Sequence, residues 1–143
     1  MPVERKLSGH RPGLQLYVAP SSIDGQGLFT SRRIPAGKKI GEFGGELISQ
    51  REARWRARRN HKIAIVELRD GHAIDASRAA NWFRYINHSC SPNAYIRIYR
   101  RHIEFYARGE IRAGQEITCD YGESHHNGRL RCTCGAANCR GSL

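Results

Sequence analysis

The stretch "NHSCSPN", residues 87–93, looks like a polar turn, yet it carries a cysteine, Cys90. The residues on either side of it, 82–86 and 95–99, are apolar and aromatic enough for burial. Near the C-terminus, "CTCGAANC" supplies three more cysteines within eight residues: Cys132, Cys134 and Cys139. Together with the upstream cysteine they make four thiols, the number of ligands that a closed zinc site needs.

The composition fits one globular domain. The chain has 143 residues, near the commonest domain size, of which 39% are hydrophobic and 26% are charged. No stretch is apolar enough to span a membrane, and residues 1–13 lack the apolar segment of a secretory signal. The five cysteines are an odd number, which argues against a disulfide framework and for reduced thiols. We therefore expect an intracellular protein, with nucleus and cytoplasm both open.

The formal net charge is +11, which is large for a chain of this size. A field of this sign attracts polyanions, so the charge predicts that the protein contacts nucleic acid or works beside it. The alternative is that the excess of Lys and Arg only keeps a small protein soluble. Charge alone does not name the partner.

Short strands separated by turns are predicted from "LQLYV", residues 14–18, onward, because apolar and polar side chains alternate there as in a half-buried strand. Further along, the dipeptide Asp70-Gly71 signals a two-residue hairpin turn. A second hairpin is expected in residues 94–107, whose two strands carry apolar residues on matching faces. The other predicted strands lie in residues 22–29 and 38–49.

One helix is predicted, "QREARWRARRNHK" in residues 50–62. It contains good helix formers and no Gly or Pro, with Ser49 placed to cap it and Glu52 at the capping-box position. Six of its residues are basic and one is acidic, so it is either a solvated face or a surface for an anionic partner. Many short strands with one helix predict a compact, mostly β fold.

The three tail cysteines lie in a loop containing Gly and Asn, which can wrap around an ion. This segment is too poor in apolar residues to order itself by forming a core, so a metal is a plausible organiser. The alternative is that these thiols are free or form a redox pair. Cys119 is flanked by strand-like residues and is interpreted as a small buried apolar residue. A zinc hydrolase is disfavoured, because four thiolates leave no open metal position and no HExxH motif is present.

Four stretches in a fixed order are more specific together than any one of them alone. They are "GQGLF" (25–29), "GEFGGELI" (41–48), "NWFRYINHSCSPN" (81–93) and "GQEITCDYG" (114–122). They resemble the SET-domain family of protein-lysine methyltransferases, and "CTCGAANCRGSL" (132–143) resembles the post-SET tail of that family. The resemblance predicts an N-terminal arm in residues 1–13, a SET catalytic domain in 14–123 and a post-SET zinc-binding tail in 124–143.

The resemblance implies a SET fold of several small β-sheets with one short helical insert, which would form one wall of the substrate groove. The C-terminal segment would thread under the "NHS" segment in a knot-like arrangement that brings Asn87 and His88 beside Tyr121. Cys90 matches the family position that reaches the zinc of the tail, so the metal would tie the tail to this loop. The implied ligands of one structural Zn²⁺ are Cys90, Cys132, Cys134 and Cys139.

The implied activity is methyl transfer from S-adenosylmethionine to a lysine amine of a histone or of another nucleic-acid-associated protein, such as a ribosomal or nucleoid protein. Tyr121 matches the catalytic tyrosine of the family, and Phe43 and Cys119 would line the substrate channel. Glycines in the "GQGL" turn allow the backbone to approach the cofactor closely. The implied cofactor-binding residues are Gly25, Gln26, Gly27, Leu28, Arg84, Asn87, His88, Tyr121 and Leu143.

Three residues depart from the family pattern. Phe43 stands where many members have tyrosine, and Gln26 replaces a large aromatic residue that many members carry. Cys119 stands where related enzymes have phenylalanine or tyrosine, which limits the number of methyl groups added, so the smaller side chain predicts di- or trimethylation. These departures favour a second hypothesis, a SET-like binding module that has lost turnover and tethers to nucleic acid or a ribosome. The intact Tyr121, Asn87 and His88 oppose it.

Overall fold

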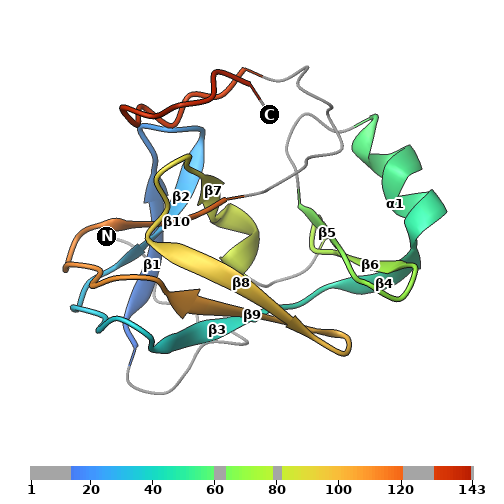
Figure 1. Cartoon of the computed structure of the whole chain (residues 1–143), viewed down its shortest axis with the longest axis horizontal. Helices are drawn as coiled ribbons and strands as arrows, with labels where there is room; N and C mark the ends of the chain where they lie inside the picture. Colours follow the sequence, from blue (N-terminus) through green and yellow to red (C-terminus); the bar gives the residue numbers. More distant parts are fainter. Residues whose placement is uncertain (1–13, 60–63, 79–81, 121–130, 143) are drawn as a thin grey trace.

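The computed structural model describes residues 14–59, 64–78, 82–120 and 131–142. Within these ranges ten strands form three small sheets, accompanied by one α-helix and one 3-10 helix (Figure 1). The mostly β fold of several small sheets expected from the sequence is therefore confirmed. None of the helices in the described ranges has the length and apolar character needed to cross a membrane.

The first sheet has the order β1-β2-β10-β7, so the last of the described strands lies between two earlier ones (Figure 1). Strand β10 runs antiparallel to β2 and parallel to β7. This insertion is the described part of the predicted threading, and residues 121–130, which would complete it, lie outside the described ranges. The bounds of the strands are β1 Leu16–Pro20, β2 Gln26–Thr30, β7 Asn87–His88 and β10 Glu116–Cys119.

The second sheet, of order β3-β9-β8, contains the predicted second hairpin. Its elements are β3 Lys39–Phe43, β8 Ala94–Tyr99 and β9 His102–Ala107. Ile96 lies opposite Phe105 and Ile98 lies opposite Ile103, which confirms the predicted matching of apolar faces. The 3-10 helix η1 (Trp82–Tyr85) covers this sheet, because the Phe83 ring stacks on Phe105 with centroids 5.4 Å apart.

The third sheet, of order β4-β6-β5, consists of β4 Glu46–Ser49, β5 Ile65–Glu67 and β6 His72–Asp75. The predicted two-residue turn at Asp70-Gly71 is wrong by one residue. The Leu68 amide donates to the His72 carbonyl at 2.8 Å, so the loop comprises residues 69–71. Gly71 has φ 83°, the left-handed conformation that three-residue hairpin loops require of their last residue.

Helix α1 (Gln50–Ala57) begins where the sequence predicted and ends earlier. The Ser49 hydroxyl caps it by accepting from the Glu52 amide at 3.1 Å, as expected. Only Ala53 and Ala57 are buried, and the exposed arginines that follow offer no apolar side chain to extend this packing. The helix therefore stops at Ala57 rather than at residue 62, and residues 60–63 lie outside the described ranges.

Arg56 attaches α1 to the third sheet through three carboxylates. Its guanidinium donates to Glu46 at 2.8 Å, to Glu52 at 2.8 Å and to Asp75 at 2.9 Å. Burial opposes ionisation of Asp75, but hydrogen bonds from Ser77 and Arg56 together hold the pKa of its carboxyl below the usual value. The helical insert is thus held by a charged network as well as by its two alanines.

Gly45, just before β4, lies where no side chain fits. A Cβ atom there would be 2.2 Å from the carbonyl oxygen of Asp75 and 2.6 Å from its carbonyl carbon. These are backbone atoms of the neighbouring strand β6, which cannot move without disturbing the sheet. The glycine is therefore required by the close approach of two chain segments.

We expect Gly45→Ala to lower the free energy of unfolding by about 2–3 kcal/mol, the upper range for overpacking a filled site. Urea denaturation would measure it. Gly109→Ala is the matched control, because no atom lies within 4 Å of its added Cβ, and it should change stability by less than about 0.5 kcal/mol. Equal stability of the two variants would contradict the packing argument.

Candidate functional site

The side chain of Asn87 joins β10 to the turn before β2, by which we mean residues 21–26, where the "GQGL" motif begins. Its Nδ2 donates to the carbonyl oxygens of Asp24 at 3.1 Å and Gln26 at 3.0 Å, and to Glu116 Oε1 at 2.9 Å. The residue is 2% exposed, and its two amide hydrogens are shared among three acceptors. The structure thus brings together the turn and Asn87, two parts of the predicted cofactor site.

Glu116 is a site residue that the sequence interpretation missed. Its carboxylate accepts from the Ser21 hydroxyl at 2.8 Å as well as from Asn87. A Cβ at Gly27 would lie 2.2 Å from Glu116 Oε1, so the second glycine of the turn makes room for this carboxylate. The available signal was a single acidic residue at the start of the otherwise uncharged strand "EITC".

Asn93, at the far end of the 87–93 loop, also binds β10. Its side-chain oxygen accepts from the Thr118 amide at 2.9 Å, and its Nδ2 donates to the Glu116 carbonyl at 2.8 Å. The Ser89 amide donates to the Cys119 carbonyl at 3.0 Å. The loop is thus hydrogen-bonded to β10 along its length, and Asn93 is a second residue that sequence reasoning missed.

His88 faces the C-terminal tail and is 3% exposed. Its Nε2 lies 3.3 Å from Cys90 Sγ and 3.3 Å from the Arg140 guanidinium, which also donates to Asp120 at 2.7 Å. Burial lowers the pKa of His88, and the nearby Asp120 carboxylate only partly opposes this. The imidazole is therefore neutral at neutral pH, and the Arg140 side chain docks the tail at the end of β10.

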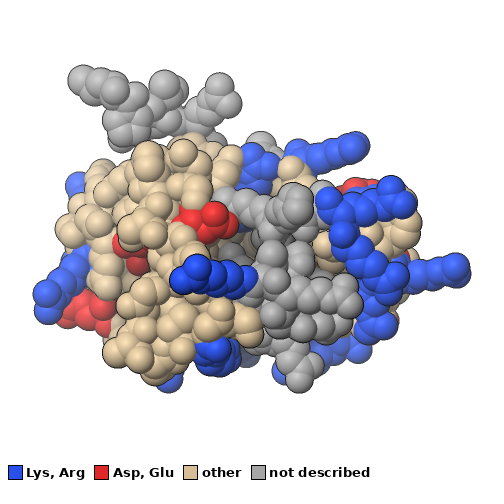
Figure 2. Space-filling model, turned by 90° about the horizontal axis from the view of Figure 1, so that it is seen from above, with Lys and Arg blue, Asp and Glu red and all other residues tan. Residues whose placement is uncertain are grey.

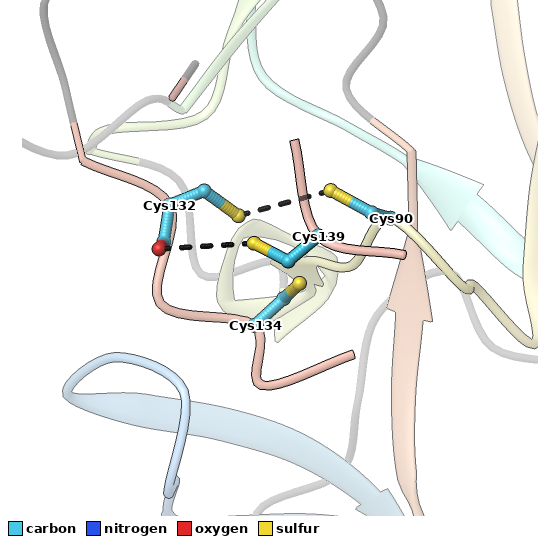
Figure 3. A group of neighbouring side chains, drawn as sticks. All are labelled: Cys90, Cys132, Cys134 and Cys139. Carbon is cyan, nitrogen blue, oxygen red and sulfur yellow. Dashed lines mark hydrogen bonds between the residues drawn. The ribbon is translucent and has the colours of Figure 1, made fainter. Parts of the chain in front are cut away.

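The four predicted zinc ligands converge, with one contributed by the loop and three by the tail (Figure 3). Their Sγ atoms all lie within 4.8 Å of one another, and those of Cys90 and Cys132 are 3.9 Å apart. Zinc bonded to four sulfurs at about 2.3 Å places those sulfurs about 3.8 Å apart. The donor set and its spacing therefore fit a tetrahedral Zn²⁺.

Hydrogen bonds shape the tail around this cluster. Asn138 donates to the Cys90 carbonyl at 3.0 Å, and the Thr133 hydroxyl donates to the Ile23 carbonyl at 2.6 Å. The tail thus contacts both the 87–93 loop and the turn before β2. A hydrogen bond from the Cys90 backbone lowers the pKa of Cys134 to about 6, so this thiol is ionised at neutral pH, the form that binds a metal.

The remaining predicted residues are placed as follows. Phe43 is buried and tilted against Phe105, with ring centroids 6.4 Å apart. Cys119 belongs to the same hydrophobic cluster, and burial raises the pKa of its thiol to about 12, which confirms its interpretation as a small buried residue. Arg84 donates to the Ser77 carbonyl at 2.9 Å and stacks on the ring of Tyr85. Two further predicted residues, Tyr121 and Leu143, lie outside the described ranges.

A zinc assay tests the cluster. We expect one zinc per chain in the purified protein and its loss from Cys132→Ser, because removing one of four thiolates opens the site. Cys119→Ser is the matched control, since that cysteine is buried in β10 and is not one of the four clustered thiols, and it should retain the metal. Mass spectrometry of metal content would measure both. Zinc retained by Cys132→Ser would contradict the assignment of its ligands.

Comparison with known proteins identifies the class. The SET domain family matches residues 25–122, which is most of the chain and includes all four motifs. The chain therefore belongs to the SET-domain family, and the family predicted from those motifs is confirmed.

Three histone-lysine N-methyltransferases illustrate the similarity of this chain to known proteins. The chain is 36% identical over 138 residues, 90% of its length, to the histone-lysine N-methyltransferase, H3 lysine-4 specific, of Schizosaccharomyces pombe. It is 34% identical over 90% of its length to the histone-lysine N-methyltransferase SETD1B of Homo sapiens. It is 32% identical over 84% of its length to the histone-lysine N-methyltransferase trithorax of Drosophila melanogaster. The chain spans only 15%, 7% and 3% of these three proteins, respectively.

Proposed function

We propose that this chain transfers methyl groups from S-adenosylmethionine to a lysine side chain of a histone. The observation that carries the proposal is the family match over residues 25–122, together with relatives whose names describe histone-lysine N-methyltransferases. These names favour a histone over the ribosomal or nucleoid proteins considered from the sequence. They also favour an enzyme over a binding module without turnover, and a histone substrate places the protein at chromatin.

The turn before β2 and the 87–93 loop are the proposed binding site of the methyl donor. Residues 24–26 are exposed, the carbonyls of Asp24 and Gln26 accept from Asn87, and that of Gly25 accepts from the Ser21 amide at 2.8 Å. The backbone of the turn is therefore fixed where a ligand can reach it. The donor supplies a methyl group on a positively charged sulfonium. The buried His88 is neutral, and the neighbouring Arg140 is paired with Asp120 at 2.7 Å, so neither adds an unpaired positive charge against a cationic ligand.

The chemistry requires alignment of the lysine amine with the methyl carbon, loss of the ammonium proton and exclusion of water. Tyr121 is the proposed residue for alignment, with its hydroxyl orienting the amine. It follows directly on Asp120, whose carboxylate is fixed by Arg140 at 2.7 Å. The zinc would be a structural ion that holds the tail against the loop and the turn. It would take no part in the chemistry, because four thiolate ligands leave no coordination position for substrate.

The lysine would enter from the side of α1. A cleft of about 410 Å³ opens there, lined by Gly45, Glu46, Asp75 and Arg78. It adjoins the helical insert to which the resemblance assigns one wall of the substrate groove. Both carboxylates are bound by Arg56, which also binds Glu52, so three carboxylates face the guanidiniums of Arg56 and Arg78 on this side of α1. This side therefore suits a positively charged peptide better than the outer surface of a +11 chain does.

Incubation with labelled S-adenosylmethionine and histone H3 tests the proposal. We expect methyl incorporation by the chain and an approximately 100-fold or greater loss of rate in Tyr121→Phe, the size of effect of removing one aligned polar group. Tyr99→Phe is the control, because this tyrosine is 54% exposed at the end of β8, and it should keep the rate within about twofold. Donor binding without methyl transfer to any histone would favour the binding-module hypothesis instead.

The number of methyl groups added should depend on Cys119. We expect the wild-type chain to form di- or trimethyl-lysine and Cys119→Phe to shift the product toward monomethyl-lysine, because the larger side chain fills the space for a methylated amine. Cys119→Ala should keep the wild-type product distribution. Mass spectrometry of the modified peptide measures all three. Monomethyl-lysine as the sole product of the wild-type chain would overturn this assignment.

A further inference from the structure

Arg51 and Trp55 of α1 form one basic surface with Arg58 and Arg59 of the turn that follows Ala57, and this surface is called the outer face of α1 below. The Arg58 and Arg59 amides still donate to the carbonyls of Arg54 and Arg56, so the chain continues to coil beyond Ala57. At helical spacing these four residues lie opposite the buried Ala53 and Ala57. All four are exposed, and Trp55 keeps 50% of its surface in solvent. Figure 2 shows Lys and Arg side chains gathered at the end of the molecule where Figure 1 places α1.

No acidic side chain of the described residues pairs with the arginines of this outer face. Within the described ranges, Arg51, Arg58 and Arg59 form no ion pair, whereas Arg54 pairs with Glu67 at 3.5 Å and Arg56 binds three carboxylates. The guanidinium of Arg59 lies 4.1 Å above the Trp55 ring. This cation–π contact holds the charge on an aromatic support and leaves its edge free to donate hydrogen bonds.

Helix stability accounts for only part of this charge, because the helix dipole favours Arg58 and Arg59 at the C-terminal end of α1 but not Arg51. Arg51 lies in the first turn, where the helix dipole favours acidic residues, and its charge there is unfavourable. Arg54 and Arg58 are like charges four residues apart, which costs about 0.2–0.5 kcal/mol. An eight-residue helix that buries only two alanines is marginally stable, so even a small unfavourable interaction matters. Helix stability therefore does not explain Arg51 or the gathering of three unpaired arginines on one side, and an anionic partner would account for both.

We propose that the outer face of α1 binds the phosphate backbone of duplex DNA. Arg51 and the C-cap residue Arg58 are about 10 Å apart along the helix axis at about 1.5 Å per residue, a span that reaches more than one phosphate of a strand. Binding to single strands relies on several aromatic platforms along a groove, whereas this face carries one aromatic ring, and Arg59 covers one side of it. The contact is to phosphates and is independent of base sequence.

The test is binding of the full chain to a fluorescent 20-base-pair duplex, followed by anisotropy at several salt concentrations. In R51Q/R58Q/R59Q the slope of log affinity against log salt should fall by about 2.7, or about 0.9 for each lost phosphate contact. R51K/R58K/R59K keeps the charges and should keep most of the slope. Circular dichroism checks that each variant is folded.

The matched control is R32Q/R108Q/R112Q, which removes three exposed arginines far from α1 in sequence and lowers the net charge equally. It should retain most of the slope of the wild-type chain. The proposal is overturned if this control loses as much slope as the α1 variant, or if a single-stranded RNA of the same length binds more tightly and depends on the same arginines. Neither methyl donor nor histone is present, so the result is independent of the proposed enzymatic activity.

Discussion

The buried amide of Asn87 is the contact on which the arrangement of the site depends. It binds two carbonyls of the turn before β2 and the carboxylate of Glu116 on β10, so it joins segments more than sixty and nearly thirty positions away. An unsatisfied buried amide or carboxylate would cost about 1–3 kcal/mol or more, so these partners stabilise one another. The insertion of β10 between β2 and β7 is therefore fixed by side chains as well as by strand pairing.

From this junction the order extends to the tail. Asp120 follows β10 and is bound by Arg140, while Cys90 follows β7 and lies among the tail cysteines. A metal bound by those four thiolates would connect the loop to the tail through coordination bonds. The hydrogen bond from the Thr133 hydroxyl to the Ile23 carbonyl connects the tail to the turn. The proposed donor site and the zinc site are thus two ends of one hydrogen-bonded unit, and disturbance of either would reach the other.

The sequence predicted the features that depend on local patterns. Alternation located the β8–β9 hairpin, and Ser49 located the start of α1, because strand faces and helix caps are set by neighbours in the chain. It missed Glu116, Asn93 and Arg56, whose partners are distant in sequence and cannot be read from local spacing. The loop at Asp70 and the end of α1 differed because packing, rather than propensity, decides where an element stops. The four cysteines were found because the family resemblance supplied the long-range pairing.

The two sides of α1 resolve an apparent conflict between a basic chain and a basic substrate. On the inner side, Glu46, Glu52 and Asp75 surround Arg56, and the cleft adds Arg78, so carboxylates outnumber guanidiniums there by three to two. On the outer side, three arginines have no acidic partner within the described ranges. A positively charged histone tail would be repelled by the outer side and accepted by the inner one. The same short helix can therefore direct the tail toward the cleft while its outer side faces an anionic surface, and the net charge of +11 does not exclude a cationic substrate.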